Sequence, residues 1–236
     1  MSRRLVVNLN GIAQLRENFG RLEPDPVAAA TLVAVGGADG VSVQLRADRR
    51  HIQDRDARLL RQTVHTGFSL EIAPSAEMLK MALEIRPDAA VLVAERDGEL
   101  ATEGGLDLVT EVAAFGELVR ALEEARIHSS ACIAPDMAQV KAAHRIGLRA
   151  VRIFTGRYSE AAPEMAEERT RIGDAVRIAR KLGLGVGISG GLHYRNVQDL
   201  LEFDGVDEVI VGHSIVSRAL LIGMERAVSE MRALLG

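Results

Sequence analysis

The sequence predicts one domain, residues 1–236, folded as an α/β protein of the (β/α)8 barrel class (TIM barrel) with extra helices. Eight apolar runs of strand length recur along the chain, and a segment with helical spacing separates each run from the next. Alternation of strands and helices is typical of a parallel sheet. A length of 236 residues also agrees with a single barrel, which typically takes about 250 residues. Eight repeats favour a closed barrel over an open doubly wound sheet, and no Gly-rich dinucleotide fingerprint follows the first run.

The predicted strands are rich in Val, Ile, Leu and Ala. In residues 40–45, Val41, Val43 and Leu45 alternate with Ser42 and Gln44, which is the period of a pleated strand. In chain order, the eight predicted strands span residues 5–9, 40–45, 68–73, 89–94, 129–134, 150–155, 185–189 and 208–212.

Two intervening segments show clear amphipathic helical spacing. Residues 107–126 are predicted to form a helix capped by Asp107, with an apolar face of Leu108, Val112, Phe115, Val119 and Leu122. The C-terminal segment is predicted to form one helix with an apolar face of Val216, Leu220, Ala227, Met231 and Leu234.

Composition excludes several classes of protein. The hydrophobic fraction of 47% and charged fraction of 26% are ordinary for a globular domain. A net charge of −4 gives no electrostatic footprint for nucleic acid, so no nucleic-acid partner is expected. Cys132 is the only cysteine, which excludes an internal disulfide and favours a small apolar strand residue. Asn8 and Asn10 interrupt the first apolar run, so we expect no signal peptide and no membrane span, and predict a cytoplasmic protein.

A basic loop follows the second predicted strand. It contains Arg46, Arg49, Arg50 and His51. In a parallel barrel this loop lies at the carboxyl end, where barrel active sites form. Guanidinium groups and an imidazole at that end suit a phosphate-bearing substrate. On charge alone, a solvated surface loop is the favoured interpretation.

Glu71 ends the third predicted strand within the sequence Ser-Leu-Glu-Ile-Ala. Its apolar neighbours favour a general base. The alternative is a carboxylate inside the barrel that pairs with an arginine such as Arg46, and the sequence leaves both open.

Glycines end the seventh and eighth predicted strands. Gly190 and Gly191 follow strand seven, and Gly212 and His213 follow strand eight. Barrels often bind phosphate at these two ends, where glycine lets the backbone approach an anion closely. Tight strand-to-helix turns are the alternative. The long loop 95–106, which contains Thr102, predicts a lid or a substrate-contacting segment, and a loop that caps the following helix is the alternative.

The six histidines show no metal-ligand spacing, and no G-x-S-x-G elbow is present. We therefore expect no metal site. His193 lies just after the seventh strand, where it could reach the mouth of the barrel or begin a surface helix.

Five segments of the chain form a specific set of motifs. They are Pro-Asp-Pro at 24–26, Gly-Ala-Asp-Gly at 37–40, Leu-Arg-Ala-Asp-Arg-Arg-His-Ile-Gln-Asp-Arg-Asp at 45–56, Thr-Glu-Gly-Gly-Leu-Asp at 102–107, and Gly-His at 212–213. Together they resemble the pyridoxine 5'-phosphate synthase family over nearly the whole chain. The resemblance implies a barrel with extra helices, assembled as a homo-octamer.

The same resemblance implies a transferase of vitamin B6 biosynthesis with two phosphorylated small-molecule substrates and neither metal nor organic cofactor. That family condenses 1-deoxy-D-xylulose 5-phosphate with 3-amino-2-oxopropyl phosphate, and releases water and phosphate. The resemblance implies that Glu71 is a general base. It further implies two binding sets: Arg46, His51 and Thr102 for the deoxyxylulose phosphate, and Asn8, Gly191, Gly212 and His213 for the amino-ketone phosphate.

The chain departs from the family pattern at several positions. Gln44 and Gly190 stand where the family has histidines that accept and donate a proton, and neither residue can transfer one near neutral pH. Arg152 stands where an acidic residue is expected. Further departures are Asn10-Gly11 for an Asp-His pair and Phe19 for an arginine.

Two hypotheses follow. In the first, the protein catalyses the family reaction, and His193, Glu71 or Glu103 covers the missing roles. In the second, it is a diverged paralogue that binds a phosphorylated small molecule, with altered chemistry or a sensing role. The retained Glu71 and the 102–107 motif favour an enzyme, whereas the lost histidines favour altered chemistry.

Overall fold

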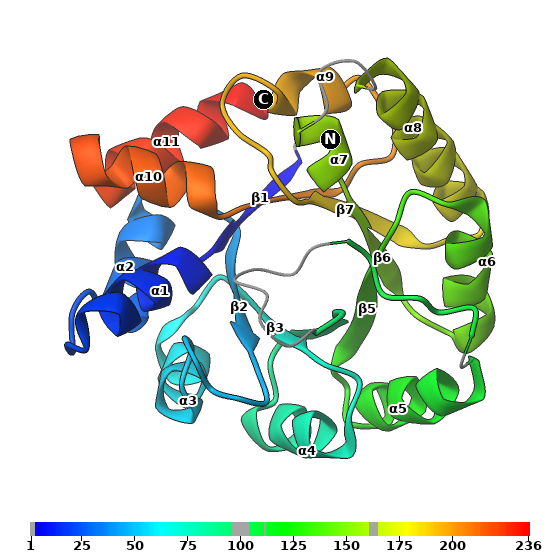
Figure 1. The fold of residues 1–236 in the computed structure, drawn as a ribbon, viewed down its shortest axis with the longest axis horizontal. Coiled ribbons are helices and arrows are strands. Elements are labelled where there is room, and N and C mark those ends of the chain that lie inside the picture. Colours follow the sequence, from blue (N-terminus) through cyan, green and yellow to red (C-terminus); the bar gives the residue numbers. More distant parts are fainter. Residues whose placement is uncertain (1–2, 96–103, 111, 161–164) are drawn as a thin grey trace.

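The protein is a closed barrel of parallel strands surrounded by helices (Figure 1). The computed structural model describes residues 3–95, 104–110, 112–160 and 165–236. Each strand pairs in parallel with the next, and β1 pairs with β8 to close the ring. The strands are β1 (Arg4–Asn8), β2 (Gly40–Leu45), β3 (Gly67–Ile72), β4 (Ala89–Leu92), β5 (His128–Ile133), β6 (Ala150–Phe154), β7 (Gly185–Ser189) and β8 (Glu208–Val211). The predicted barrel is confirmed, and the predicted strand ends agree to within two residues.

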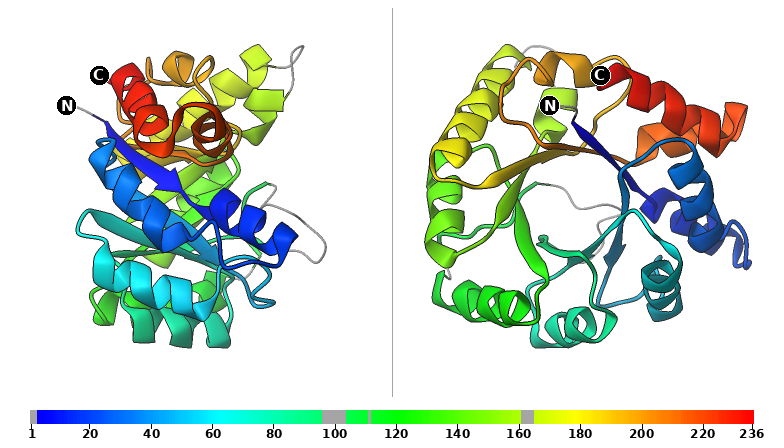
Figure 2. Two further views of the ribbon diagram at one scale, coloured as in Figure 1. Left: turned by 90° about the vertical axis from the view of Figure 1, so that its left-hand side faces the viewer. Right: turned by 180° about the vertical axis from the view of Figure 1, so that it is seen from behind.

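Helices cover the outside of the barrel, as two further views show (Figure 2). They are α1 (Asn10–Phe19), α2 (Pro26–Val35), α3 (Asp54–Thr63), α4 (Ala76–Ile85), α5 (Val112–Glu124), α6 (Met137–Ile146), α7 (Gly156–Glu160), α8 (Met165–Lys181), α9 (Val197–Leu200), α10 (His213–Ile222) and α11 (Met224–Leu234). Two helices follow each of β1, β6 and β8, which confirms the expected extra helices.

Local sequence sets the helix ends. Asp25 caps α2 by accepting a hydrogen bond from the Val27 amide at 2.8 Å, and Pro26 occupies the first helical position. Gly147 ends α6 in the left-handed conformation, with φ of 91°. These signals place short turns at both ends of the barrel.

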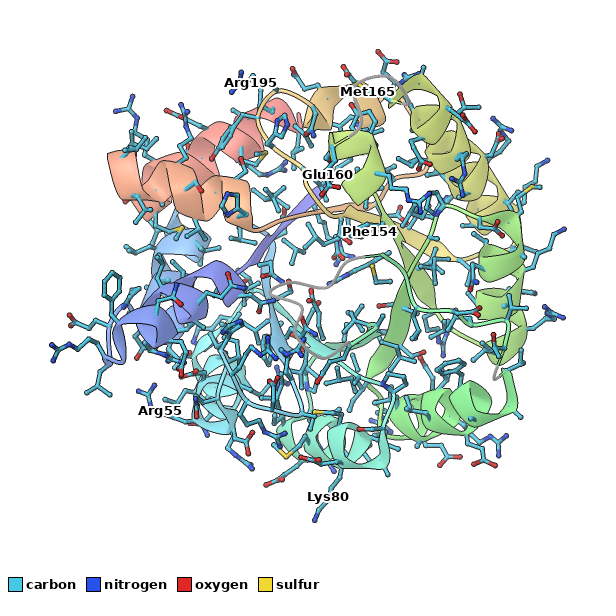
Figure 3. All side chains as sticks on the ribbon, viewed as in Figure 1. Arg55, Lys80, Phe154, Glu160, Met165 and Arg195 are labelled. Carbon is cyan, nitrogen blue, oxygen red and sulfur yellow. The ribbon has the colours of Figure 1, made fainter. Side chains whose placement is uncertain are left out.

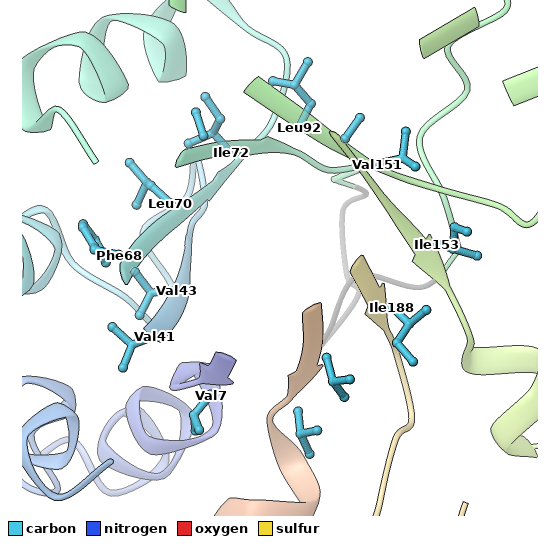
Figure 4. Close-up of a cluster of buried hydrophobic side chains, with 14 of the residues drawn as sticks. Val7, Val41, Val43, Phe68, Leu70, Ile72, Leu92, Val151, Ile153 and Ile188 are labelled. Atoms are coloured by element: carbon cyan, nitrogen blue, oxygen red, sulfur yellow. The ribbon is translucent and has the colours of Figure 1, made fainter. Parts of the chain in front are cut away.

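The main hydrophobic core lies between the strands and the helices. Outward side chains such as Val41, Val43 and Leu70 project from the strands toward the surrounding helices and are fully buried (Figure 4). The inward positions of the same strands are different, because they carry polar and charged side chains such as Ser42, Gln44 and Glu71. Strand alternation thus separates an apolar layer outside the barrel from a largely polar interior.

The predicted single C-terminal helix is wrong. Gly223, with φ of 86°, separates α10 from α11, a backbone conformation that glycine adopts without strain. Leu220 is 70% exposed rather than part of a common apolar face. The predicted helix at 107–126 is shorter, because α5 spans Val112–Glu124 and Asp107 accepts a hydrogen bond from the Val109 amide in the preceding turn.

No helix within the described ranges is both long and apolar enough to cross a membrane.

Candidate active site

A cavity of about 290 Å³ opens at the carboxyl ends of the strands. Residues of all eight strands and of the loops after β7 and β8 line it, together with residues of α1 and the first turn of α10. Its lining comprises Asn8, Asn10, Gly11, Gln14, Gln44, Glu71, Val91, Val93, Cys132, Arg152, Phe154, Ser189, Gly190, Gly191, Leu192, His193, Ile210, Gly212, His213 and Ser214. Phe154, for example, lies at the inner side of the barrel wall, whereas Arg55 and Lys80 lie at the periphery (Figure 3).

Glu71 lies in this cavity with its side chain mostly buried. Its Oε1 accepts a hydrogen bond from Arg152 Nη1 at 2.9 Å and another from Asn8 Nδ2 at 3.2 Å. The sequence left open a general base or an ion pair with an arginine such as Arg46. The structure shows an ion pair, but with Arg152 of β6 rather than with Arg46.

Asn8 organises the end of β1. Its amide nitrogen donates to Ser42 Oγ at 3.1 Å as well as to Glu71, and its Oδ1 accepts from the Asn10 amide at 3.0 Å. Asn10 Oδ1 in turn accepts from the Gln44 amide at 2.8 Å. These bonds tie the beginning of α1 to the ends of β2 and β3.

The loop after β7 is fixed by side chains of its neighbours. Thr155 Oγ1 donates to the Gly190 carbonyl at 2.5 Å, and Asn196 Nδ2 donates to the Gly191 carbonyl at 3.2 Å. Both glycines have positive φ, 106° and 66°, which explains why glycine occupies these positions. A Cβ at position 191 would lie 2.5 Å from Cβ of Ser159. The turn is therefore held rigidly.

Gly212 and His213 form the junction between β8 and α10. A Cβ at position 212 would lie 3.1 Å from Cβ of Asn8, so glycine permits close packing against β1. The N-cap residue of α10 is Gly212, which has no side chain to accept a hydrogen bond from the first backbone amides of the helix. The N-terminus of a helix attracts anions through its amides and dipole, and here it faces the cavity.

His193 also lines the cavity. Its Nδ1 accepts a hydrogen bond from the Arg195 amide at 3.2 Å, so the neutral imidazole carries its proton on Nε2. The ring is therefore oriented as a donor through Nε2.

The opposite wall of the cavity is apolar. Val91, Val93 and Cys132 form a small cluster inside the barrel, and Phe154 packs against it. Burial raises the pKa of the Cys132 thiol to about 11, so the residue remains protonated and unreactive. This agrees with the prediction of a small apolar strand residue.

Arg46 and His51 are not among the residues that line this cavity. They lie at the end of β2 and in the loop before α3. Arg46 is buried and forms ion pairs with Asp48 at 3.2 Å and Glu95 at 3.8 Å. Burial raises the pKa of Asp48, but hydrogen bonds from Arg46 and Arg50 outweigh it and lower the pKa to about 2.

Neither ring nitrogen of His51 has a hydrogen-bond partner in the part of the chain that the structure describes, although both are buried. Burial lowers the pKa of His51, which favours the neutral imidazole. Buried polar atoms usually have partners, so this ring is a candidate for a hydrogen bond to a ligand. Its backbone is fixed, because Arg16 donates to the His51 carbonyl at 2.8 Å.

The structure brings five predicted residues together around the cavity: Asn8, Glu71, Gly191, Gly212 and His213. Thr102 and Glu103 lie outside the described residues. Within the described ranges, no group of three or more His, Cys, Asp or Glu side chains is arranged to hold a metal ion.

The sequence patterns did not single out several lining residues, among them Gln14, Phe154 and Ile210. Strand alternation could have identified two of them, since Phe154 lies two positions after Arg152 and Ile210 two before Gly212.

Comparison with solved structures shows the same fold. A 3-keto-L-gulonate-6-phosphate decarboxylase from Vibrio cholerae superposes with a TM-score of 0.67 at 16% identity, covering 100% of this chain and 98% of that one. A thiamine phosphate pyrophosphorylase from Pyrococcus furiosus gives a TM-score of 0.63 at 16% identity, covering 99% and 95%.

Sequence comparison is more specific. The chain is 45% identical to a pyridoxine 5'-phosphate synthase from Geobacter metallireducens over 230 residues, covering 97% of this chain and 96% of the relative. It is 46% identical to the enzyme of that name from Thermosynechococcus vestitus, with 98% of both chains covered. The model of the family described as pyridoxal phosphate biosynthesis protein PdxJ matches residues 5–236. The chain therefore belongs to the PdxJ family of pyridoxal phosphate biosynthesis proteins.

Proposed function

We propose that this protein is a transferase, a pyridoxine 5'-phosphate synthase. It condenses 1-deoxy-D-xylulose 5-phosphate with 3-amino-2-oxopropyl phosphate to form pyridoxine 5'-phosphate, phosphate and water. The observation that carries the proposal is the position of Glu71, which lies in a cavity bounded by two glycine turns and a helix N-terminus. This arrangement places a carboxylate beside a backbone suited to phosphate.

The amino-ketone phosphate binds at the loops after β7 and β8 in this proposal. Gly191, Gly212 and His213 supply backbone amides and an exposed imidazole, and Asn8 holds the adjoining strand end. The support is the rigid turn at Gly191 together with the uncapped beginning of α10.

The deoxyxylulose phosphate binds at the end of β2, through Arg46, His51 and Thr102. Support comes from the buried Arg46 guanidinium and from the His51 ring described above. A neutral imidazole can donate a hydrogen bond to a phosphate or hydroxyl oxygen and accept one from a hydroxyl group.

Proton transfer requires a substitute for the two family histidines, since Gln44 and Gly190 occupy their positions. Glu71 is the proton acceptor in this proposal. His193 is the proton donor, because it lines the same cavity and an imidazole, unlike glutamine or glycine, gains and loses a proton near neutral pH.

Restoring the histidine at position 190 is expected to harm the protein. A Cβ there would lie 2.7 Å from Cε2 of Phe154, and the φ of 106° disfavours a side chain. Gly190→His should lower the free energy of unfolding by about 1–3 kcal/mol and should not raise activity. Urea unfolding measures the first effect and the synthase assay the second.

The matched control is Gly183→His. Gly183 has φ of 78°, but no neighbouring atom of the described residues would lie within 4 Å of a Cβ at this position. The control therefore carries the backbone strain without the crowding. The double variant Gly190→His/Phe154→Ala should recover part of the stability lost by Gly190→His. An unchanged stability of Gly190→His would show that Phe154 does not fill the histidine's space.

We also propose a homo-oligomer, an octamer by family resemblance. Two consecutive leucines at the end of α10, Leu220 and Leu221, are 70% and 85% exposed, and Leu22 before α2 is 89% exposed. Such residues, beside an apolar groove formed by α1, α2 and α10, are typical of contacts between subunits. Light scattering from the purified protein measures the assembly.

The deciding experiment is a synthase assay with deoxyxylulose phosphate and freshly generated amino-oxopropyl phosphate. Chromatography follows pyridoxine 5'-phosphate, and a second assay follows released phosphate. Formation of both products in equal amounts supports the proposal. Binding of either phosphate without product would refute it and support the diverged paralogue instead.

A further inference from the structure

Arg152 projects from β6 into the barrel and lies between two carboxylates. Its Nη1 is 2.9 Å from Glu71 Oε1, and its Nη2 is 3.5 Å from Glu208 Oε2. The arginine side chain is only 5% exposed. Glu208 is held from its other side by Arg4 at 3.2 Å. The guanidinium group is thus fixed at both ends by charged partners.

Gly187 of β7 makes room for this arrangement. It lies between Arg152 and Glu208 in the strand register. A Cβ at position 187 would lie 3.3 Å from Cγ of Arg152 and 3.6 Å from Oε2 of Glu208. The absent side chain lets Arg152 and Glu208 approach each other across β7.

The hydrogen bonds to Glu71 are unequal between its two oxygens. Arg152 and Asn8 both donate to Oε1. Within the described part of the chain, Oε2 accepts no hydrogen bond. One oxygen of the carboxylate is held by two donors, and the other is available to a ligand in the cavity.

We propose that Arg152 is a positioning residue, which holds Glu71 through Oε1 so that Oε2 meets the substrate proton. The inference rests on the proposed function, in which Glu71 is the general base. In the step concerned, Oε2 takes a proton from the substrate, the bonding electron pair stays on the substrate, and Glu71 becomes a neutral carboxylic acid. Arg152 stays protonated throughout, as guanidinium groups do in proteins.

The role is separable from charge balance by a paired substitution. Arg152→Met alone leaves the mostly buried Glu71 without its charged partner and Glu208 with only the exposed Arg4, and it is expected to destabilise the fold. Arg152→Met/Glu208→Gln removes one positive and one negative charge, so the net charge inside the barrel is the same as in the wild type. A cooperative thermal unfolding transition is the criterion that this double variant is folded.

The folded double variant should show a kcat about 100-fold lower, because misplacing a reacting group by about 1 Å has an effect of that size. KM should change less than about threefold, since Arg152 makes no substrate contact in this inference. Arg152→Lys keeps the positive charge, and its kcat should lie between those of the double variant and the wild type. A double variant with wild-type kcat would overturn the inference, because it would show that Arg152 serves charge balance alone.

Crystal structures of the wild type and the double variant provide a second readout that needs no activity. The inference expects the Glu71 carboxylate to turn, so that Oε1 leaves Asn8 Nδ2 in the double variant. If the Glu71 carboxylate keeps its orientation in the double variant, Arg152 does not position it. This holds even if the wild type makes no product. Absence of product from the wild type, with a carboxylate that turns in the double variant, would refute the proposed function and leave the positioning role intact.

Discussion

Glu71→Gln is expected to lower kcat for pyridoxine 5'-phosphate formation by about 10²- to 10⁴-fold, the range that a general base typically contributes. Glutamine has nearly the same shape as glutamate, and its carbonyl oxygen can still accept the hydrogen bonds from Arg152 and Asn8. It cannot accept a proton near neutral pH. KM should change little, because the two phosphate sites stay intact. Steady-state kinetics in the synthase assay measures both constants.

The matched control is Glu84→Gln, the same chemical change on the outer surface of α4. Glu84 forms an exposed ion pair with Arg58 at 2.5 Å and lies outside the cavity. The Glu84→Gln protein should have the same kcat as the wild type. A Glu71→Gln protein with more than about a tenth of wild-type kcat would exclude Glu71 as the general base. His193→Gln would then be the next variant to measure, since His193 is the proton donor in the proposed function and lines the same cavity.

The barrel was predictable because each strand carries its own signal. Val41, Val43 and Leu45 alternate with Ser42 and Gln44, and this period holds in the structure, with the apolar set buried against helices. Such a local pattern depends only on neighbouring residues. The predicted strand ends differ from the observed ones by up to two residues.

The C-terminal helix pair shows where local periodicity misleads. Leu220 has the right spacing for a buried face with Val216, yet it is 70% exposed. A single glycine at position 223 reorients the chain, and helical periodicity cannot show whether such a glycine continues the helix or ends it. The proposed oligomer would cover the exposed Leu220 and Leu221, and a pattern within one chain cannot reveal a contact with another.

The sequence predicted where several residues of the site lie in the fold, but it did not predict which arginine pairs with Glu71. Asn8, Glu71, Gly191 and Gly212 meet at one cavity because parallel strands bring their carboxyl ends to one face. The partner of Glu71 is 81 residues away in sequence, on β6. Arg46 was the nearer arginine in sequence, but it is occupied by Asp48 and Glu95. Only the register around the whole barrel determines which arginine faces Glu71.

A second large effect is expected at the buried ion pair between α1 and α3. Arg16 donates to both carboxylate oxygens of Asp56, at 3.0 Å and 2.6 Å, and their side chains are 9% and 0% exposed. Asp56→Asn leaves the Arg16 charge buried and largely uncompensated, so the free energy of unfolding should fall by about 3–5 kcal/mol. Urea unfolding at pH 7 measures this. Asp54→Asn, at a more exposed carboxylate of the same helix, should cost less than about 1 kcal/mol.

The same pair predicts how stability depends on pH. Burial raises the pKa of Asp56, but hydrogen bonds from Arg16 and the Gln53 amide outweigh it, so the pKa in the folded protein is lowered. The unfolded chain therefore binds a proton at Asp56 at higher pH than the folded protein does. The stabilisation is complete above the unfolded pKa of about 4 and is lost as pH falls toward the lowered folded value. The difference in unfolding free energy between wild type and Asp56→Asn should thus shrink on acidification below about pH 4, and a difference that stays constant to about pH 3 would show that the pair does not lower the pKa of Asp56.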